Sequence, residues 1–251
     1  MRCPFAEWIP WNPVAPDGRP TYFAGRNQPV AVVLHVMQGY QATARRWALN
    51  GHYGQSWHYS VARDGSIMQH LEHHHGGYHA GISAWKAQHY RPTWPLWRGP
   101  GQNVNTYTIG VEHEGFAGQP FAPEQARASR RLCRWLAEVL DIPMDTAHFP
   151  AHADIDLRDR PNDFNTPALR RDFYAFLFAP EELHMADAEM AGQITDLDER
   201  LAVLNDAVVI DRDLRRLANR GHPGNWKLHR LLRENGYESE MEYRGDYRDY
   251  A

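Results

Sequence analysis

The stretch "AHADIDLRDRPNDFN", residues 151–165, concentrates side chains that could bind a metal ion. It contains one histidine, His152, and four aspartates: Asp154, Asp156, Asp159 and Asp163. A catalytic zinc site typically combines three nitrogen, oxygen or sulfur ligands with one open position. A solvated acidic loop would have the same composition. A metal site would therefore need a further ligand from elsewhere in the chain.

His35 is the first candidate for that ligand. It is the one polar residue in "PVAVVLHVM" (29–37), a β-branched apolar run typical of a buried central strand. A buried imidazole needs partners for its ring nitrogens, because leaving them unpaired costs free energy. A hydrogen-bonded core histidine and a metal ligand both fit this position. Spacing alone does not show that His35 and His152 meet.

The surrounding elements predict an α/β fold with a central mixed β-sheet flanked by helices. Strands are expected at 29–37 and 106–115, and a hairpin at 56–71 that turns at Asp64-Gly65. Helices are expected at 41–50, 122–143 and 166–178, the last with Thr166 as N-cap and Pro167 at its first position. Residues 1–28 are expected to form an irregular arm.

The character of the sequence changes near residue 180. We expect one domain over residues 1–179 and a helical appendage over residues 180–251. Apolar residues from Met190 to Val208 follow a 4-3-4 spacing, which is a short heptad seam, and the segment 211–235 is basic. Residues 190–233 are therefore candidates for self-association or envelope contact. Packing on the first domain and a solvated helix face are the alternatives.

Composition excludes several classes of protein. The net charge of −4 lacks the basic excess of duplex-binding proteins, so no nucleic-acid partner is expected. With Cys3 and Cys133 as its two cysteines, the chain cannot form a cysteine-based zinc finger or a disulfide framework. No apolar run approaches the roughly 18 residues of a transmembrane helix. The start, "MRCPFAEWIPW", lacks a signal-peptide pattern, so synthesis in the cytoplasm without export by a signal peptide is expected.

Five stretches, in this order, resemble the type-2 N-acetylmuramoyl-L-alanine amidases, a zinc amidase family that includes phage endolysins and peptidoglycan-recognition proteins. They are "VAVVLH", "SWHYSVARDGSI", "YHAG", "TIGVEHEG" and "AHADIDLRDRPND", and with the closing helix the resemblance covers about residues 29–178. The resemblance implies that zinc (Zn2+) is bound by His35, His152 and Asp163. It also implies that Glu112 acts on the attacking water and that Arg160 polarises the scissile carbonyl.

The sequence around the third ligand departs from the family pattern. The family usually has Pro-Gly after it, whereas Phe164-Asn165 follow Asp163 here, and the basic residue is an arginine three rather than two positions earlier. The other three aspartates of the loop remain alternatives. Asp154 suits a role in orienting the loop or a ligand better than direct coordination.

Substrate contacts are expected from histidines and aromatic residues. The resemblance places His58 and His79 near the cleft, and we add Trp57 and Trp85 as substrate-binding residues. The loop 82–100, which contains Trp85, Tyr90, Trp94 and Trp97, would form a wall of a glycopeptide groove; loop packing is the alternative. The consecutive histidines of "EHHH" (72–75) point in different directions and cannot all bind one ion, so a mostly solvated loop is expected there.

The implied activity is zinc-dependent hydrolysis of the amide between N-acetylmuramic acid and L-alanine in peptidoglycan or muropeptides. A phage or prophage endolysin that degrades the cell wall is the expected setting. A cytosolic muropeptide-recycling amidase and a non-catalytic peptidoglycan-binding module of the same fold are the alternatives. The two histidines and the aspartate favour the enzyme over the binding module. A zinc peptidase of another fold is disfavoured, because the sequence has no His-Glu-x-x-His.

Overall fold

The structure is a computed structural model that describes residues 1–89 and 91–180. Residues Met1–Ala179 form one compact unit. The expectations for residues 190–233, and that for Tyr90, lie outside the described residues. Within the described part, no helix is long and apolar enough to cross a membrane.

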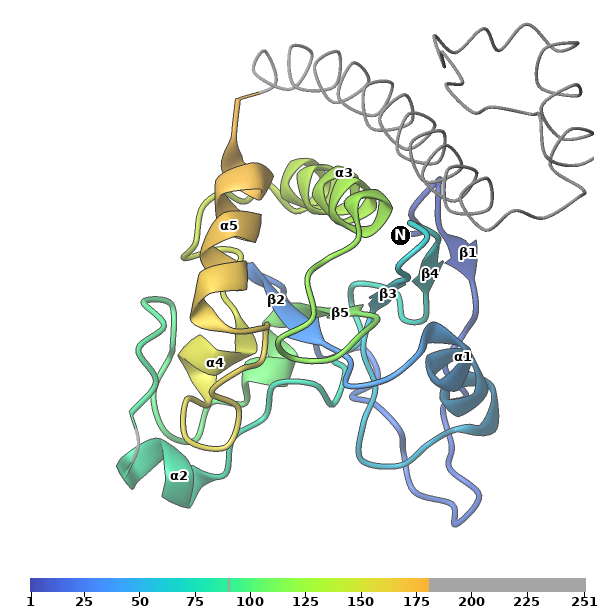
Figure 1. Cartoon of the computed structure of the whole chain (residues 1–251). Helices are drawn as coiled ribbons and strands as arrows, with labels where there is room; N and C mark the ends of the chain where they lie inside the picture. The colour runs from blue at the N-terminus through green and yellow to red at the C-terminus, as the bar shows by residue number, and fades with distance from the viewer. Residues whose placement is uncertain (90, 181–251) are drawn as a thin grey trace, which may run out of the picture. The chain divides into compact units, whose positions relative to one another are not determined.

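A five-stranded mixed sheet forms the centre of the unit (Figure 1). Its strands are β1 (Glu7–Trp8), β2 (Ala31–Val36), β3 (Tyr59–Val61), β4 (Ile67–Gln69) and β5 (Thr108–His113). They lie in the order β1-β4-β3-β5-β2; β3 and β4 are antiparallel, and the other neighbours are parallel. The expected α/β fold with a mixed sheet is confirmed. Strand β1 was not expected, because two residues carry no readable alternation.

Helices flank this sheet. They are α1 (Gln41–Asn50), α2 (Ala84–His89), α3 (Pro123–Leu140), α4 (His152–Ile155) and α5 (Pro167–Phe178), with the 3-10 helix η1 (Val104–Thr106) before β5. The three longest match the predicted segments. Thr166 and Pro167 begin α5 as expected, although the Thr166 side chain makes no capping hydrogen bond. The hairpin also forms as predicted, with Gly65 at φ 85° in its turn, a conformation that glycine adopts without strain.

The two faces of the sheet are covered differently. Because side chains alternate along a strand, Val32 and Leu34 face α3 and α5, where they pack with Leu132 and Leu136. Each fully buried leucine contributes roughly 1.5–3 kcal/mol to the stability of the fold. On the opposite face, Val33 packs against the 80–107 segment, and α1 covers the sheet nearer β3 and β4 (Figure 1). This second face also carries His35, which follows Val33 in the same alternation.

Candidate metal centre

His35 and Glu112 are neighbours on the sheet. They occupy paired positions of the parallel strands β2 and β5, so their side chains project from the same face. The His35 Nδ1 atom lies 3.9 Å from Glu112 Oε1. The imidazole is almost fully buried, whereas the Glu112 side chain keeps 13% of its surface exposed. The strand register alone therefore brings a buried imidazole and a partly exposed carboxylate together.

His152 is positioned by a short pairing of the chain with the outer edge of β2. The Leu34 N–H donates to the Pro150 carbonyl at 2.9 Å, and Leu34 and Ala151 form a parallel bridge. Helix α4 then begins at His152, whose ring centroid lies 4.6 Å from that of His35. The chain thus adds a few paired residues to the sheet edge and places the second imidazole beside the first.

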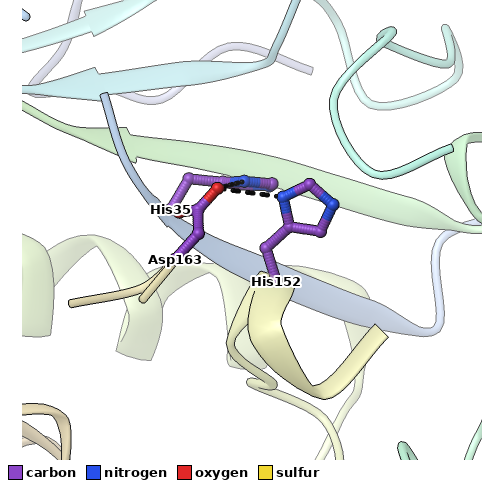
Figure 2. A group of neighbouring side chains, drawn as sticks. All are labelled: His35, His152 and Asp163. Atoms are coloured by element: carbon purple, nitrogen blue, oxygen red, sulfur yellow. Dashed lines mark hydrogen bonds and ion pairs between the residues drawn. The ribbon is translucent and has the colours of Figure 1, made fainter. Parts of the chain in front are cut away.

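Asp163 completes the cluster from the loop between α4 and α5. Its Oδ2 atom lies 3.0 Å from His152 Nδ1 and 3.6 Å from His35 Nδ1, as Figure 2 shows. One potential ligand atom from each of these residues lies within 4.8 Å of the others. The sequence-predicted ligand set His35, His152 and Asp163 is therefore brought together in the structure.

The three rival aspartates of the loop face cations elsewhere. The Asp154 Oδ2 atom accepts a hydrogen bond from the Ala151 N–H at 3.0 Å, and its Oδ1 atom lies 3.5 Å from Arg170. Asp156 and Asp159 both pair with Lys86 of α2, with an Asp156–Lys86 distance of 3.0 Å. These carboxylates hold the loop in place. Asp154 in particular fixes the residue that precedes His152.

The charges of the cluster depend on burial. Burial lowers the pKa of His35 to about 4, so its ring is neutral near pH 7. Burial alone would raise the pKa of the Asp163 carboxyl, but contacts with His152 and His35 outweigh it and hold that pKa far below its ordinary range. Burial and the nearby charge of Asp163 raise the pKa of Glu112 well above its ordinary value. A neutral imidazole and a carboxylate are the forms that bind metal.

The donor set fits zinc. Two imidazoles and one carboxylate are the kind of donors that catalytic zinc sites use, so His35, His152 and Asp163 would hold the ion. Two buried atoms at the cluster, Glu112 Oε2 and His152 Nε2, have no hydrogen-bond partner in the described protein. Buried polar atoms are normally paired, so such atoms indicate a place where another group binds.

Arg160 lies near this cluster on the exposed part of the loop. Its positive charge opposes the rise in the pKa of Glu112 and contributes to the low pKa of His35, which places its guanidinium within electrostatic range of both. The backbone of Arg160 also spans the loop: its N–H donates to the Asp156 carbonyl, and its carbonyl accepts from the Asp163 N–H.

The predicted substrate-binding residues differ in their placement. Trp57 is only 3% exposed; its Nε1–H donates to Ser60 Oγ, and its ring packs against Trp11. His58 is fully buried, and both ring nitrogens contact backbone, one at Gly110 and the other at the His75 carbonyl. The expectation that Trp57 and His58 touch substrate is therefore corrected: both belong to the interior.

His79 lies at the metal cluster, and Trp85 lies at the protein surface. The His79 Nδ1 atom is 3.1 Å from His35 Nε2, so His79 contacts a candidate ligand directly. Trp85 is 56% exposed on α2 and stacks on His89. In contrast, Trp94 is buried, stacks on Tyr107 and donates to the Ala147 carbonyl. For Trp94, loop packing was the correct alternative.

The "EHHH" segment contains three histidines with three environments. His73 is buried, with Nε2 2.6 Å from the Tyr59 hydroxyl, which corrects the expectation of a mostly solvated loop. His74 is exposed, 3.6 Å from Glu72, and His75 Nδ1 accepts from the Gly25 N–H. As predicted from the sequence, the three rings do not converge on one point.

Three features near the site were not anticipated from the sequence. Thr108 lies 3.3 Å from His79 through its hydroxyl, and Lys86 binds two of the rival aspartates. Exposed Tyr40 and Phe116 also pair at the ends of β2 and β5, with ring centroids 5.7 Å apart. Each depends on contacts between segments distant in sequence, so no local signal marked them.

Comparison with known proteins agrees with this geometry. Residues 25–165 match the Amidase_2 family, described as N-acetylmuramoyl-L-alanine amidase. The chain belongs to this family. The matched range contains all three candidate ligands and Glu112, so the type-2 amidase resemblance seen in the sequence is confirmed.

Individual amidases of the family show how far the likeness extends. N-acetylmuramoyl-L-alanine amidase A of Achromobacter lyticus is 31% identical over 133 residues, which cover 52% of this chain and 61% of that relative. A selenomethionine derivative of AmpD has a TM-score of 0.51 and 18% identity, with 71% of this chain and 97% of that chain covered. The amidase LysC from Clostridium intestinale covers 71% of this chain and all of its own, with a TM-score of 0.46 and 18% identity. The AmpD structure supports the shared fold.

Proposed function

We propose that this protein is a zinc-dependent N-acetylmuramoyl-L-alanine amidase that hydrolyses the amide between the lactyl group of N-acetylmuramic acid and L-alanine. The observation that carries the proposal is the convergence of His35, His152 and Asp163, with Glu112 at its border. Family membership supplies the substrate class. A non-catalytic binding module would not require this complete set of ionisable groups.

The residues divide the chemistry among them. When bound, zinc would act as a Lewis acid and lower the pKa of a coordinated water. Glu112 accepts the proton of the attacking water and returns it to the leaving amine; its raised pKa suits a group that must both accept and donate near neutral pH. Arg160 contributes positive charge where the carbonyl oxygen becomes negative.

We further propose that the substrate is polymeric cell wall, as for an endolysin. The support is the basic segment 211–235, which suits a polyanionic wall. A muropeptide-recycling amidase would act on soluble fragments instead. The ratio of the rates on purified walls and on soluble muropeptides distinguishes the two settings.

The activity itself is tested by the bond that breaks. Zinc-loaded protein should release new N-terminal L-alanine from purified peptidoglycan, detected by amino-group labelling, without producing new reducing sugar ends. Glu112→Gln should abolish most of this release, whereas Glu138→Gln, at an exposed position of α3, should not. New reducing ends, or cleavage between amino acids of the stem, would refute the amidase assignment.

A further inference from the structure

A line of hydrogen bonds leads from the metal cluster into the backbone. The His35 Nε2 atom is 3.1 Å from His79 Nδ1, and His79 Nε2 is 3.3 Å from the Thr108 hydroxyl. That hydroxyl lies 2.8 Å from the Val104 carbonyl oxygen. The His35 and His79 rings are nearly perpendicular, at 86°, with centroids 5.2 Å apart. The line therefore begins at the His35 nitrogen that faces away from Asp163.

The Val104 carbonyl at the end of this line determines which atom is the donor in each hydrogen bond. A carbonyl oxygen only accepts, so the single hydroxyl proton of Thr108 is donated to Val104. The Thr108 oxygen must then accept from His79 Nε2–H. A neutral imidazole carries one N–H, so His79 Nδ1 is an acceptor. His35 must consequently donate from Nε2, and its Nδ1 atom keeps a free lone pair.

We propose that His79 is a positioning residue that fixes His35 in the tautomer whose Nδ1 lone pair faces Asp163 and His152. Histidine ligands usually donate their second N–H to a neighbouring group, which sets the ring orientation and tautomer. Here that group is itself a histidine, oriented by Thr108. The inference deepens the proposed function, since it rests on zinc binding at this cluster. It replaces the expected role of His79 in substrate contact, because both of its ring nitrogens are occupied.

The fold holds His79 independently of any ion. A Cβ atom at Gly110 would lie 2.6 Å from His79 Cγ, so only glycine lets the ring lie against β5. The backbone is fixed as well: the N–H groups of His79 and Ala80 donate to Asn105 Oδ1 at 3.2 and 2.7 Å. The acceptor for His35 is therefore in place before the metal binds.

The decisive measurement is the tautomer of His35 in zinc-free protein, read from the ring nitrogen shifts in long-range proton–nitrogen NMR. The expected result is protonation at Nε2 in the natural protein. His79→Leu, which removes the acceptor, should give a mixture of tautomers, whereas His79→Asn, whose side-chain oxygen can replace Nδ1, should retain Nε2–H. An unchanged tautomer in His79→Leu would overturn the proposal.

Zinc affinity, measured by chelator competition, gives a second readout that does not depend on turnover. His79→Leu should weaken binding by about 10–100-fold, the range typical of groups that orient a ligand, and His79→Asn should restore most of it. If His79→Leu fails to fold, Thr108→Val and its matched control Thr108→Ser test the same line from its other end. Unchanged affinity in Thr108→Val and His79→Leu, with only a raised KM, would assign His79 to substrate binding instead.

These outcomes are separable from failure of the amidase proposal. If the natural protein binds zinc and responds to His79→Leu but releases no N-terminal L-alanine, the positioning role stands and the reaction assignment falls. If amidase activity is found but His79→Leu leaves zinc affinity unchanged, the reaction assignment stands and the positioning role of His79 is wrong.

Discussion

The Asp163 Oδ1 atom accepts a hydrogen bond from the Val36 N–H at 2.8 Å, which joins the acidic loop to the strand that carries His35. Its second oxygen, Oδ2, faces the two histidines. One carboxylate therefore fixes the loop register and contributes to the metal cluster. The resemblance selects Asp163 among the four aspartates of the loop, and this contact with β2 sets Asp163 apart from the other three.

Removal of the Asp163 carboxylate should therefore abolish stable zinc binding. Residues that only orient a metal ligand typically change metal affinity by roughly 10–100-fold. We expect Asp163→Ala to weaken zinc binding by more than this, because it removes both a ligand and the contact that anchors the loop. Asp159→Ala, which loses exposed contacts with Lys86 and Arg158, should retain stoichiometric zinc. Metal analysis after dialysis against a weak chelator checks both. Loss of zinc in Asp159→Ala but not in Asp163→Ala would show that the ligand register is wrong.

Glu112→Gln should separate metal binding from turnover. The amide preserves the size of the side chain but cannot take a proton from water, so we expect zinc content to persist while kcat falls by about 10²–10⁴-fold. The measurement is release of N-terminal L-alanine by protein of verified zinc content. A variant that is inactive only because it has lost zinc would argue that Glu112 has a structural role.

Much of the fold was readable from the sequence because its main elements carry strong local signals. The β-branched run around His35, the Asp-Gly hairpin and the amphipathic helix α3 each satisfy one periodicity over several residues. The short elements β1, α2, η1 and α4 were not predicted. Strand β1 depends on pairing with β4, and α4 follows the Leu34–Ala151 bridge to β2, so neither is marked by local propensity.

The site was predictable only in part for the same reason. The candidate ligands came from the resemblance, and the structure brings them together. The resemblance assigned His58 to the cleft and Trp57 was added beside it, but neither step could show that the fold buries both side chains. The contact of His79 with His35 spans 44 positions, and its orientation by Thr108 depends on β5 lying beside β2. Such relations follow from sheet order, which the sequence did not specify.

The exposed rings of Tyr40 and Phe116 are predicted to contact the glycan or peptide of the substrate. The antiparallel Gly39–Gly115 bridge lies just beyond the parallel pairing of β2 and β5 that includes His35 and Glu112, so the two rings stand at the same end of these strands. Tyr40→Ala should raise KM by about 2–10-fold, the equivalent of one aromatic contact, with zinc affinity unchanged. Tyr53→Ala, an exposed tyrosine stacked with Arg19, is the control. Equal KM values in the two variants would exclude this surface.

Stability should fall in mild acid because of histidines away from the metal cluster. Burial lowers the pKa of His58 to about 3 and that of His70 to about 4, whereas both are near 6.5 in the unfolded chain. The unfolded state therefore binds protons first, and stability present above pH 6.5 is lost as the pH falls toward 4. At pH 5 each histidine should account for about 2 kcal/mol of this loss.

Urea unfolding of zinc-free protein at pH 7.5 and pH 5 measures this dependence. His70→Gln should reduce the difference between the two pH values by about 2 kcal/mol, whatever its effect on stability at pH 7.5. His74→Gln, at an exposed position, should leave the difference unchanged. The same pH dependence in all three proteins would contradict the assignment to buried histidines.

The last residues of the described domain contact α3. Both Arg130 and Arg134 donate to the Ala179 carbonyl, and Leu177 is fully buried in the core against α3. The three candidate ligands and Glu112 precede this point. A chain that ends after Pro180 keeps all of these contacts, whereas one that ends after Phe178 loses the carbonyl that both arginines use.

We predict that the chain shortened to residues 1–180 folds, binds one zinc ion and cleaves soluble muropeptides at about the full-length rate. The chain shortened to residues 1–178 should be less stable by roughly 1.5–3 kcal/mol, because hydrogen bonds to charged groups are lost.

Toward whole cell walls, the chain of residues 1–180 should act more slowly than the full chain. This deficit in the rate of lysis should narrow at high salt if the basic segment 211–235 acts through charge. Turbidity loss at several salt concentrations measures this. Insoluble or zinc-free protein of residues 1–180 would show that later residues complete the core, and equal lysis by both chains at every salt concentration would remove the targeting role.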